Sequence, residues 1–205
     1  ILVSGTIDKN GNVNIDDYSY VLDEQSILNE SSQGNFSLIV EENGSILNKL
    51  FFQPEFLIAF IGGNVTEVNV SAFSFVVPFS DNVTNIIIKE NNITKDQINR
   101  TQNTPTLNIT SNLSGQVFYN ELFNVTWNAS DLDGGELAYA ILFSSDDGSN
   151  YTTLEMDYNQ TTLVLNSSTL PSCQFCRIKV LATDGINTNS SVSDVFNVNH
   201  VLEVN

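Results

Sequence analysis

Apolar and polar residues alternate in short runs along most of this chain, which is the pattern of half-buried β-strands. In Phe123-Asn-Val-Thr-Trp-Asn-Ala129 every second residue is apolar, and asparagine and threonine fill the positions between. Ser71-Ala-Phe-Ser-Phe-Val-Val-Pro78 repeats this alternation, and Pro78 should end or edge its strand. Such runs favour an all-β fold.

Short strands separated by turn residues are predicted from end to end. Lys9-Asn10-Gly11 is a good hairpin turn because Asn-Gly tolerates positive φ. The first half gives strand candidates at Ile1–Asp8, Asn12–Ile15, Asn35–Glu41, Ile46–Gln53, Val65–Val77 and Asn85–Lys89. The second half gives Thr106–Thr110, Glu121–Ala129, Leu137–Phe143, Tyr151–Met156, Thr162–Leu165, Cys176–Thr183 and Val192–Val198.

The chain length of 205 residues suits two sandwich domains in tandem. Residues 91–105 form a polar stretch without an apolar period, and we interpret them as a linker with room for one helical turn at Thr94–Arg100. The predicted organisation is an N-terminal β-sandwich over residues 1–90, this linker, and a second sandwich over residues 106–205.

Three segments of the second half carry a family resemblance. Val125-Thr-Trp-Asn-Ala-Ser-Asp-Leu-Asp-Gly-Gly-Glu-Leu-Ala-Tyr139, Phe143-Ser-Ser-Asp-Asp-Gly148 and Ile178-Lys-Val-Leu-Ala-Thr-Asp-Gly185 resemble a fibronectin type III-like or immunoglobulin-like repeat. Such repeats are known from archaeal and bacterial surface proteins and from secreted hydrolases. The resemblance covers about residues 105–198, and it implies display or binding. Residues 1–104 resemble no family that we recognise.

The acceptor pattern for N-linked glycans, Asn-x-Ser/Thr, is the strongest motif in the sequence. It occurs 16 times, whereas 28 Asn and 38 Ser or Thr among 205 residues would give about 5 by chance. The alternative is that an Asn- and Thr-rich β-protein forms the pattern idly. We predict glycosylation at Asn29, Asn35, Asn43, Asn64, Asn69, Asn82, Asn92, Asn99, Asn108, Asn112, Asn124, Asn128, Asn150, Asn159, Asn166 and Asn189.

Charge and composition narrow the partners. Acids outnumber bases 24 to 7, for a net charge of −17, so nucleic acid is excluded as a partner and an anionic membrane surface is disfavoured. The most apolar run, Phe56–Ile61, is far too short to insert in a bilayer. With the sequons, these features predict an extracellular or cell-surface location, and the low charge suggests an archaeal source.

Two local motifs suggest sites. Asp131, Asp133 and Glu136 share a glycine-bearing loop that Asp184 could approach, which predicts a calcium site, with a plain turn as the alternative. Cys173 and Cys176 are the only cysteines, and in an exported protein they are expected to form a disulfide. Free thiols, or a zinc or redox role, are the alternatives for this pair. No other cofactor is expected.

Catalytic motifs are missing. His200 is the only histidine, and the sequence contains no metalloprotease, P-loop or dinucleotide-binding motif. We therefore predict a non-enzymatic structural protein of a cell envelope, such as a surface layer, filament or adhesive stalk, that associates with itself or with other surface proteins. The alternative is a carbohydrate- or protein-binding module of a secreted enzyme or receptor, whose contact residues would be drawn from Phe118, Tyr119, Tyr158 and Phe175.

Overall fold

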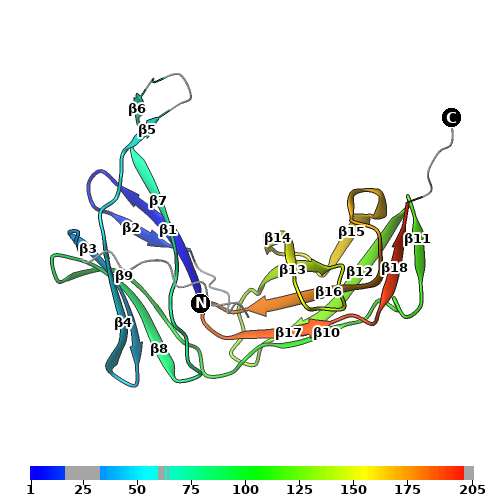
Figure 1. Cartoon of the computed structure of the whole chain (residues 1–205). Coiled ribbons are helices and arrows are strands. Elements are labelled where there is room, and N and C mark those ends of the chain that lie inside the picture. Colours follow the sequence, from blue (N-terminus) through cyan, green and yellow to red (C-terminus); the bar gives the residue numbers. More distant parts are fainter. Residues whose placement is uncertain (17–32, 60–62, 64, 201–205) are drawn as a thin grey trace. The chain divides into compact units, whose positions relative to one another are not determined.

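A computed structural model describes the chain except for residues 17–32, 60–62, 64 and 201–205 (Figure 1). Among the described residues every regular element is a β-strand apart from one 3₁₀ turn, η1 (Ser167–Thr169), so the all-β prediction is confirmed. No helix in this part of the chain is long and apolar enough to cross a membrane. The chain divides into two compact units, Ile1–Thr101 and Gln102–Asn205.

The first unit contains two antiparallel sheets and a small hairpin. One sheet has the order β2-β1-β7, with β2 (Val13–Ile15), β1 (Leu2–Asp8) and β7 (Val70–Val76). The other has the order β4-β3-β8-β9, with β4 (Ser45–Phe52), β3 (Phe36–Glu42), β8 (Val83–Glu90) and β9 (Ile93–Asn99). The hairpin pairs β5 (Leu57–Ala59) with β6 (Val65–Glu67).

Aromatic contacts join the two sheets of this unit. The ring of Phe52 in β4 lies 5.7 Å from that of Phe73 and 4.9 Å from that of Phe75, both in β7, measured between centroids. Gly5 in β1 has no room for a side chain, because a Cβ there would fall 2.4 Å from the carbonyl oxygen of Asn14 and 2.5 Å from the ring of Phe73. The close approach of the β1 backbone to β2 therefore requires glycine.

The predicted linker is wrong over much of its length. Residues 93–99 form β9, an edge strand paired with β8, and the helical turn expected at Thr94–Arg100 does not form. The strand lacks an apolar period because several of its side chains are exposed and one makes a polar contact, in which Asp96 Oδ2 accepts the Ile15 N–H at 2.8 Å. Just after β9, the Arg100 N–H donates to the Thr84 carbonyl at 2.8 Å. The first unit thus continues to Thr101.

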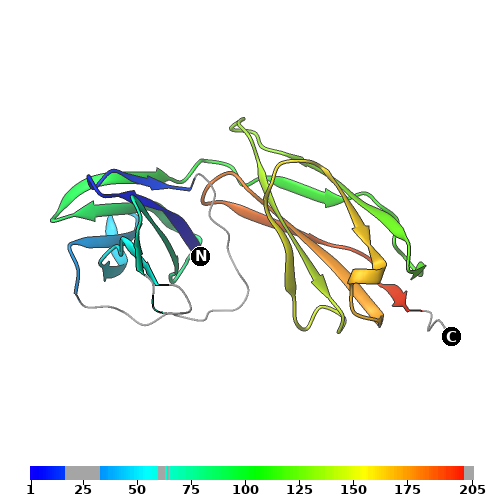
Figure 2. The ribbon, with the colours of Figure 1, turned by 90° about the horizontal axis from the view of Figure 1, so that it is seen from above.

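The second unit is a sandwich of two facing sheets (Figures 1 and 2). We call the three-stranded one the small sheet, which has the order β10-β12-β15, with β10 (Thr106–Ile109), β12 (Leu122–Ser130) and β15 (Thr162–Asn166). The other, the large sheet, has the order β11-β18-β16-β13-β14, and β17 also pairs with β16. Its strands are β11 (Val117–Tyr119), β13 (Ala138–Ser144), β14 (Thr152–Tyr158), β16 (Cys173–Thr183), β17 (Thr188–Val192) and β18 (Phe196–Asn199).

This strand order confirms the fibronectin type III-like or immunoglobulin-like sandwich expected for residues 106–198, since the first, second and fifth long strands form one sheet and the others face it. The last predicted strand, Val192–Val198, differs from the structure: β17 and β18 are interrupted around Ser193. There the Ser193 Oγ accepts the Ile178 N–H at 3.0 Å while the Ser193 N–H donates to the Ile178 carbonyl at 2.8 Å.

The core of the second unit centres on Trp127 in β12. Its ring is buried and meets the ring of Tyr139 edge-on at 5.4 Å between centroids. Among the described residues no hydrogen bond of normal geometry is recorded for the Trp127 Nε1–H, so this indole contributes mainly through packing and through its aromatic contact. The facing residues alternate along their strands, as the sequence predicts, and include Phe123, Val125, Ile141, Phe143, Leu163, Leu165, Ile178, Val180 and Phe196.

Candidate functional site

The predicted glycan acceptors share one property, which is exposure to solvent. Asn29 and Asn64 lie outside the described residues, and the other 14 sequon asparagines are all exposed. Of the 11 described asparagines outside sequons, 6 are exposed. Asparagine is usually exposed whatever its context. If the 5 asparagines that are not exposed were distributed at random among all 25 described asparagines, all 5 would fall outside the sequons only about once in a hundred times. Accessibility at these sites therefore goes beyond what residue type explains.

Four of these asparagines lie on the outward face of the small sheet. Asn108 in β10 and Asn128 in β12 are cross-strand partners, and Asn124 lies on the same face four residues earlier. Asn166 ends β15 opposite Leu122, which also faces outward. The hydroxyls of Thr110 and Thr126 lie 2.9 Å apart on this face. A glycan at any of these positions would project into solvent, away from the core that contains Trp127.

The large sheet differs. Its strands β13, β14, β16 and β18 contain no sequon asparagine, and only Asn189 falls within a strand, β17. Asn150 and Asn159 lie in the turns that flank β14. The acceptors are thus unevenly placed on this sandwich, with the small sheet carrying them on its face and the large sheet at its margins.

Two acceptor side chains have a structural partner at the atom that would carry the sugar. The Nδ2 of Asn189 donates to the Pro105 carbonyl at 2.8 Å, and that of Asn150 donates to Asp146 Oδ2 at 2.7 Å. Hydrogen bonds from the Asn150 side chain, the Asn150 N–H and the Ser144 hydroxyl lower the pKa of Asp146 to about 2. By contrast, Asn166 uses its Oδ1 to accept the Ser168 N–H at 3.0 Å, and no hydrogen bond donated by its Nδ2 is recorded among the described residues.

Three of the four carboxylates predicted to hold calcium do come together. Oxygen atoms of Asp131, Asp133 and Asp184 all lie within 4.8 Å of one another, while Glu136 is not part of this group. Gly134 and Gly135, both at positive φ, turn the chain between Asp133 and Glu136. Their turn keeps Glu136 out of the cluster, so its assignment as a ligand is not supported.

Amide groups bind two of these carboxylates. Asn103 donates from its N–H to Asp133 Oδ2 at 2.5 Å and from its Nδ2 to Asp133 Oδ1 at 2.6 Å. Asn187 donates to both oxygens of Asp184 at 3.1 and 3.2 Å, and to the Asn103 carbonyl at 2.8 Å. The sequence analysis missed Asn103 and Asn187, because neither lies in the acidic loop and no motif marks them.

Asp131 is the carboxylate with an unsatisfied oxygen. Its Oδ1 accepts the Asp133 N–H at 2.6 Å, but its Oδ2 is buried, and no hydrogen bond that meets normal geometry reaches it from the described residues. Desolvation raises the pKa of Asp131, and the neighbouring Asp184 and Asp133 raise it further. A proton or a cation would relieve this charge. The geometry suits either a calcium loop or a plain amide-bonded turn, and calcium here stays a prediction.

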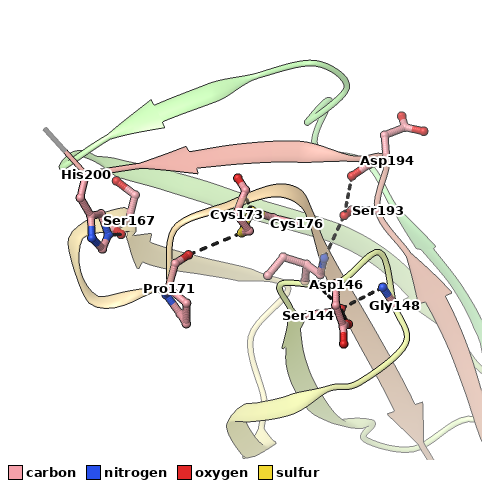
Figure 3. The surroundings of a disulfide bond; sticks show 11 residues. Ser144, Asp146, Gly148, Ser167, Pro171, Cys173, Cys176, Ser193, Asp194 and His200 are labelled. Carbon is pink, nitrogen blue, oxygen red and sulfur yellow. Dashed lines mark hydrogen bonds between the residues drawn. A yellow bond between two sulfur atoms is a disulfide. The ribbon is translucent and has the colours of Figure 1, made fainter.

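Cys173 and Cys176 form a disulfide in β16, with their Cα atoms 5.6 Å apart (Figure 3). Cys173 pairs with Val198 and Cys176 with Phe196, so the bridge spans a bulge in which β16 has one residue more than β18. No ligand set for zinc surrounds it among the described residues, since the only metal-ligating group found there is the aspartate cluster. The bridge pins an irregular end of the large sheet.

The candidate contact residues divide into core and surface. Phe118 stacks on Phe123 at 4.0 Å, and Tyr158 packs near Trp127 and donates to the Thr162 carbonyl at 2.7 Å. Tyr119 and Phe175 are exposed.

The first unit contributes a concave site. A cavity of about 560 Å³ is lined by Ile7, Phe52, Phe73 and Phe75 together with polar residues from 53–55 and 71–74.

His200 Nε2 lies 3.2 Å from the Ser167 carbonyl, so this contact is not a serine–histidine catalytic pair.

No protein-family model and no curated protein matches the sequence. Among solved structures, the fibronectin(III)-like modules of CbhA from Clostridium thermocellum match with 14% identity, over 87% of this chain and 86% of that chain, at a TM-score of 0.39. The fold assignment for this chain therefore rests on its own strand order, and this likeness does not extend to function.

Proposed function

We propose that this chain is a non-enzymatic, N-glycosylated structural module of the cell exterior, serving in a surface layer, a filament or an adhesive stalk. The observation that carries the proposal is the exposure of all 14 described sequon asparagines, against 6 of 11 other asparagines. N-linked glycans at such sites hydrate a β-sheet surface and cover strands that would otherwise pair with other chains.

The balance of charges supports an exterior role. With 24 acids and 7 bases the chain has no basic surface large enough to hold a nucleic acid, and charged residues make up only 15% of it. A surface of amides and hydroxyls gains its hydration from attached sugar. The amide-bonded loops around Asp131 and the disulfide in the β16 bulge fix the chain near opposite ends of β16, and such rigidity suits a display role.

Electron microscopy of the glycosylated protein tests the structural role. Ordered fibres or lattices that grow with protein concentration are the expected result. A protein that stays monomeric at high concentration, with its glycans intact, would contradict self-assembly. Enzymatic removal of the glycans should be run in parallel, because amorphous aggregates that form only after deglycosylation report lost hydration rather than assembly.

A second candidate function is a binding module of a larger secreted protein, and the cavity in the first unit favours it. Three phenylalanines and the polar residues beside them offer an apolar floor and hydrogen-bonding groups, which suit a sugar or a peptide side chain. Binding to a glycan or peptide array that is lost on substituting Phe75→Ala, in a variant that circular dichroism shows to be still folded, would favour this function. Binding that survives this change would exclude the cavity as its site.

A further inference from the structure

Two Asn-Gly dipeptides occur in this sequence, Asn10-Gly11 and Asn43-Gly44, and each lies at a hairpin turn of the first unit. Glycine after asparagine leaves the backbone nitrogen unhindered, so this dipeptide is the one most prone to lose its side-chain amide. Only the second dipeptide is a sequon, Asn43-Gly44-Ser45. The two turns therefore make a matched pair that differs in local contacts and in the capacity to carry a glycan.

The β3–β4 turn is open to solvent. Asn43 and Gly44 are the two central residues between the paired Glu42 and Ser45, at φ of 49° and 79°, as a type I′ turn requires. Both are exposed, and no atom lies within 4 Å of the place where a Gly44 Cβ would be. Among the described residues no hydrogen bond donated by the Gly44 N–H is recorded. That nitrogen is free to attack the neighbouring side chain.

The β1–β2 turn is held by hydrogen bonds. The Gly11 N–H donates to the Asp8 carbonyl at 3.0 Å, and the Asp8 N–H donates to the Asn12 carbonyl at 2.9 Å. The Asp8 carboxylate accepts the N–H groups of Asn10 at 2.8 Å and Asn12 at 2.9 Å, and the Asn12 Nδ2 at 2.7 Å. An attacking Gly11 nitrogen would have to give up its bond and lose a proton close to this carboxylate, and both requirements slow the reaction.

We propose that Asn43 is a deamidation site and that a glycan on its Nδ2 protects it. In the reaction the Gly44 nitrogen bonds to Asn43 Cγ and the Cγ–Nδ2 bond breaks. The Gly44 proton leaves with Nδ2 as ammonia, and a cyclic imide remains. Water then opens the ring at either carbonyl, giving aspartate or isoaspartate. The net exchange is one water in and one ammonia out, with no oxidant or reductant.

A glycan would oppose this step directly. Once a sugar is attached, Nδ2 belongs to a secondary amide, and it would have to leave as a bulky glycosylamine rather than as ammonia. Isoaspartate would also insert an extra backbone carbon into the turn that aligns β4 with the buried strand β3. The protective half of the inference rests on the proposed glycosylation, whereas the contrast between the two turns does not.

The contrast is tested on protein made in a host without N-glycosylation and held at mildly alkaline pH. Peptide mapping by mass spectrometry should show the gain of about 1 Da at Asn43 several-fold faster than at Asn10. Synthetic peptides spanning each turn are the control and should convert at similar rates. Equal rates at the two sites of the folded protein would overturn the inference, as would an inert Asn43 whose peptide converts.

Two variants test the stated causes. Asp8→Ala removes the carboxylate that fixes the β1–β2 turn, and it should raise the rate at Asn10 toward that at Asn43. Ser45→Ala, at an exposed position, abolishes the sequon while keeping Asn43-Gly44. From a glycosylating host, this variant should accumulate aspartate and isoaspartate at residue 43 while the parent protein does not. A parent that converts as fast as the variant, or that carries no glycan at Asn43, would overturn the protective half.

Discussion

The two sheets of the second unit enclose one core but differ in what they show to solvent. The small sheet presents Asn108, Asn124, Asn128 and Asn166, all sequon asparagines. On the large sheet, the face turned away from the Trp127 core holds the buried residues Ala140 and Leu181 and the half-buried Leu142, and sequons occur only at its margins. Hydrophobic periodicity determines which residues fill the core, and it leaves the outward residues free to differ between sheets. Within this sandwich, that freedom allows the small sheet alone to present predicted acceptors across its outward face.

The largest effect should come from the core that both sheets share. Trp127→Ala removes a fully buried ring at the centre of the sandwich, so the free energy of unfolding should fall by about 3–5 kcal/mol. Urea denaturation followed by circular dichroism measures it. A loss below about 1 kcal/mol would show that the Trp127 ring is not a main contributor to the stability of this core.

Loosening one end of the large sheet alone should cost less. Replacing both Cys173 and Cys176 by serine releases the bulge in β16, and the loop that the bridge closes is short, so about 2 kcal/mol or less is expected. Hydrogen exchange should rise at β16 and β18 but not in the small sheet. Equal loosening of both sheets would argue against independent edges.

Exchanging outward residues between the sheets tests their difference directly. Leu142→Asn creates a sequon with Ser144 on β13, and it replaces a half-buried apolar side chain by a polar one. The free energy of unfolding should therefore fall by about 1–2 kcal/mol. Asn124→Leu, the matched change on β12, should stay within about 0.5 kcal/mol but lower the solubility. Thermal unfolding and precipitation assays would show this. If Leu142→Asn and Asn124→Leu lowered the free energy of unfolding equally, the two outward faces would not differ in this respect.

The acceptor asparagines should also differ among themselves. Asn189→Gln displaces the Nδ2 that bonds to the Pro105 carbonyl, so unfolding should become easier by about 1 kcal/mol. Asn124→Gln on the small sheet is the control and should change nothing measurable. If both variants unfold alike, the bond from Asn189 to Pro105 contributes nothing to the fold.

The smallest effect concerns pH. The pKa of Asp131 is raised in the folded state, chiefly by desolvation, so its contribution to stability is complete below its ordinary pKa and is lost as pH rises through the folded value. Asp131→Asn should therefore raise the melting temperature slightly at neutral pH and leave it unchanged in acid. If calcium binds, millimolar calcium should stabilise the parent protein but not this variant. If calcium stabilises neither protein, the loop is a plain turn and not a calcium site.

The alternation of residues was enough to predict the all-β class and the second sandwich, because side chains such as Phe123, Val125 and Trp127 must reach a core. It failed for β9, whose polar side chains face solvent or bond to other strands, so no apolar period marks that strand. It found the aspartate loop but not Asn103 and Asn187, since a hydrogen bond made 84 residues apart leaves no local pattern. Exposure of the sequons could be inferred only for strands with clear alternation.

The proposal depends most directly on which asparagines carry sugar. Site-resolved glycopeptide mass spectrometry of protein from a glycosylating source measures this, and Asn108, Asn124, Asn128 and Asn166 on the small sheet should be occupied in most molecules. Asn150 and Asn189, whose Nδ2 atoms already donate hydrogen bonds, should be the least occupied. A protein with sugar at only one or two sites, or with none on the small sheet, would contradict the account.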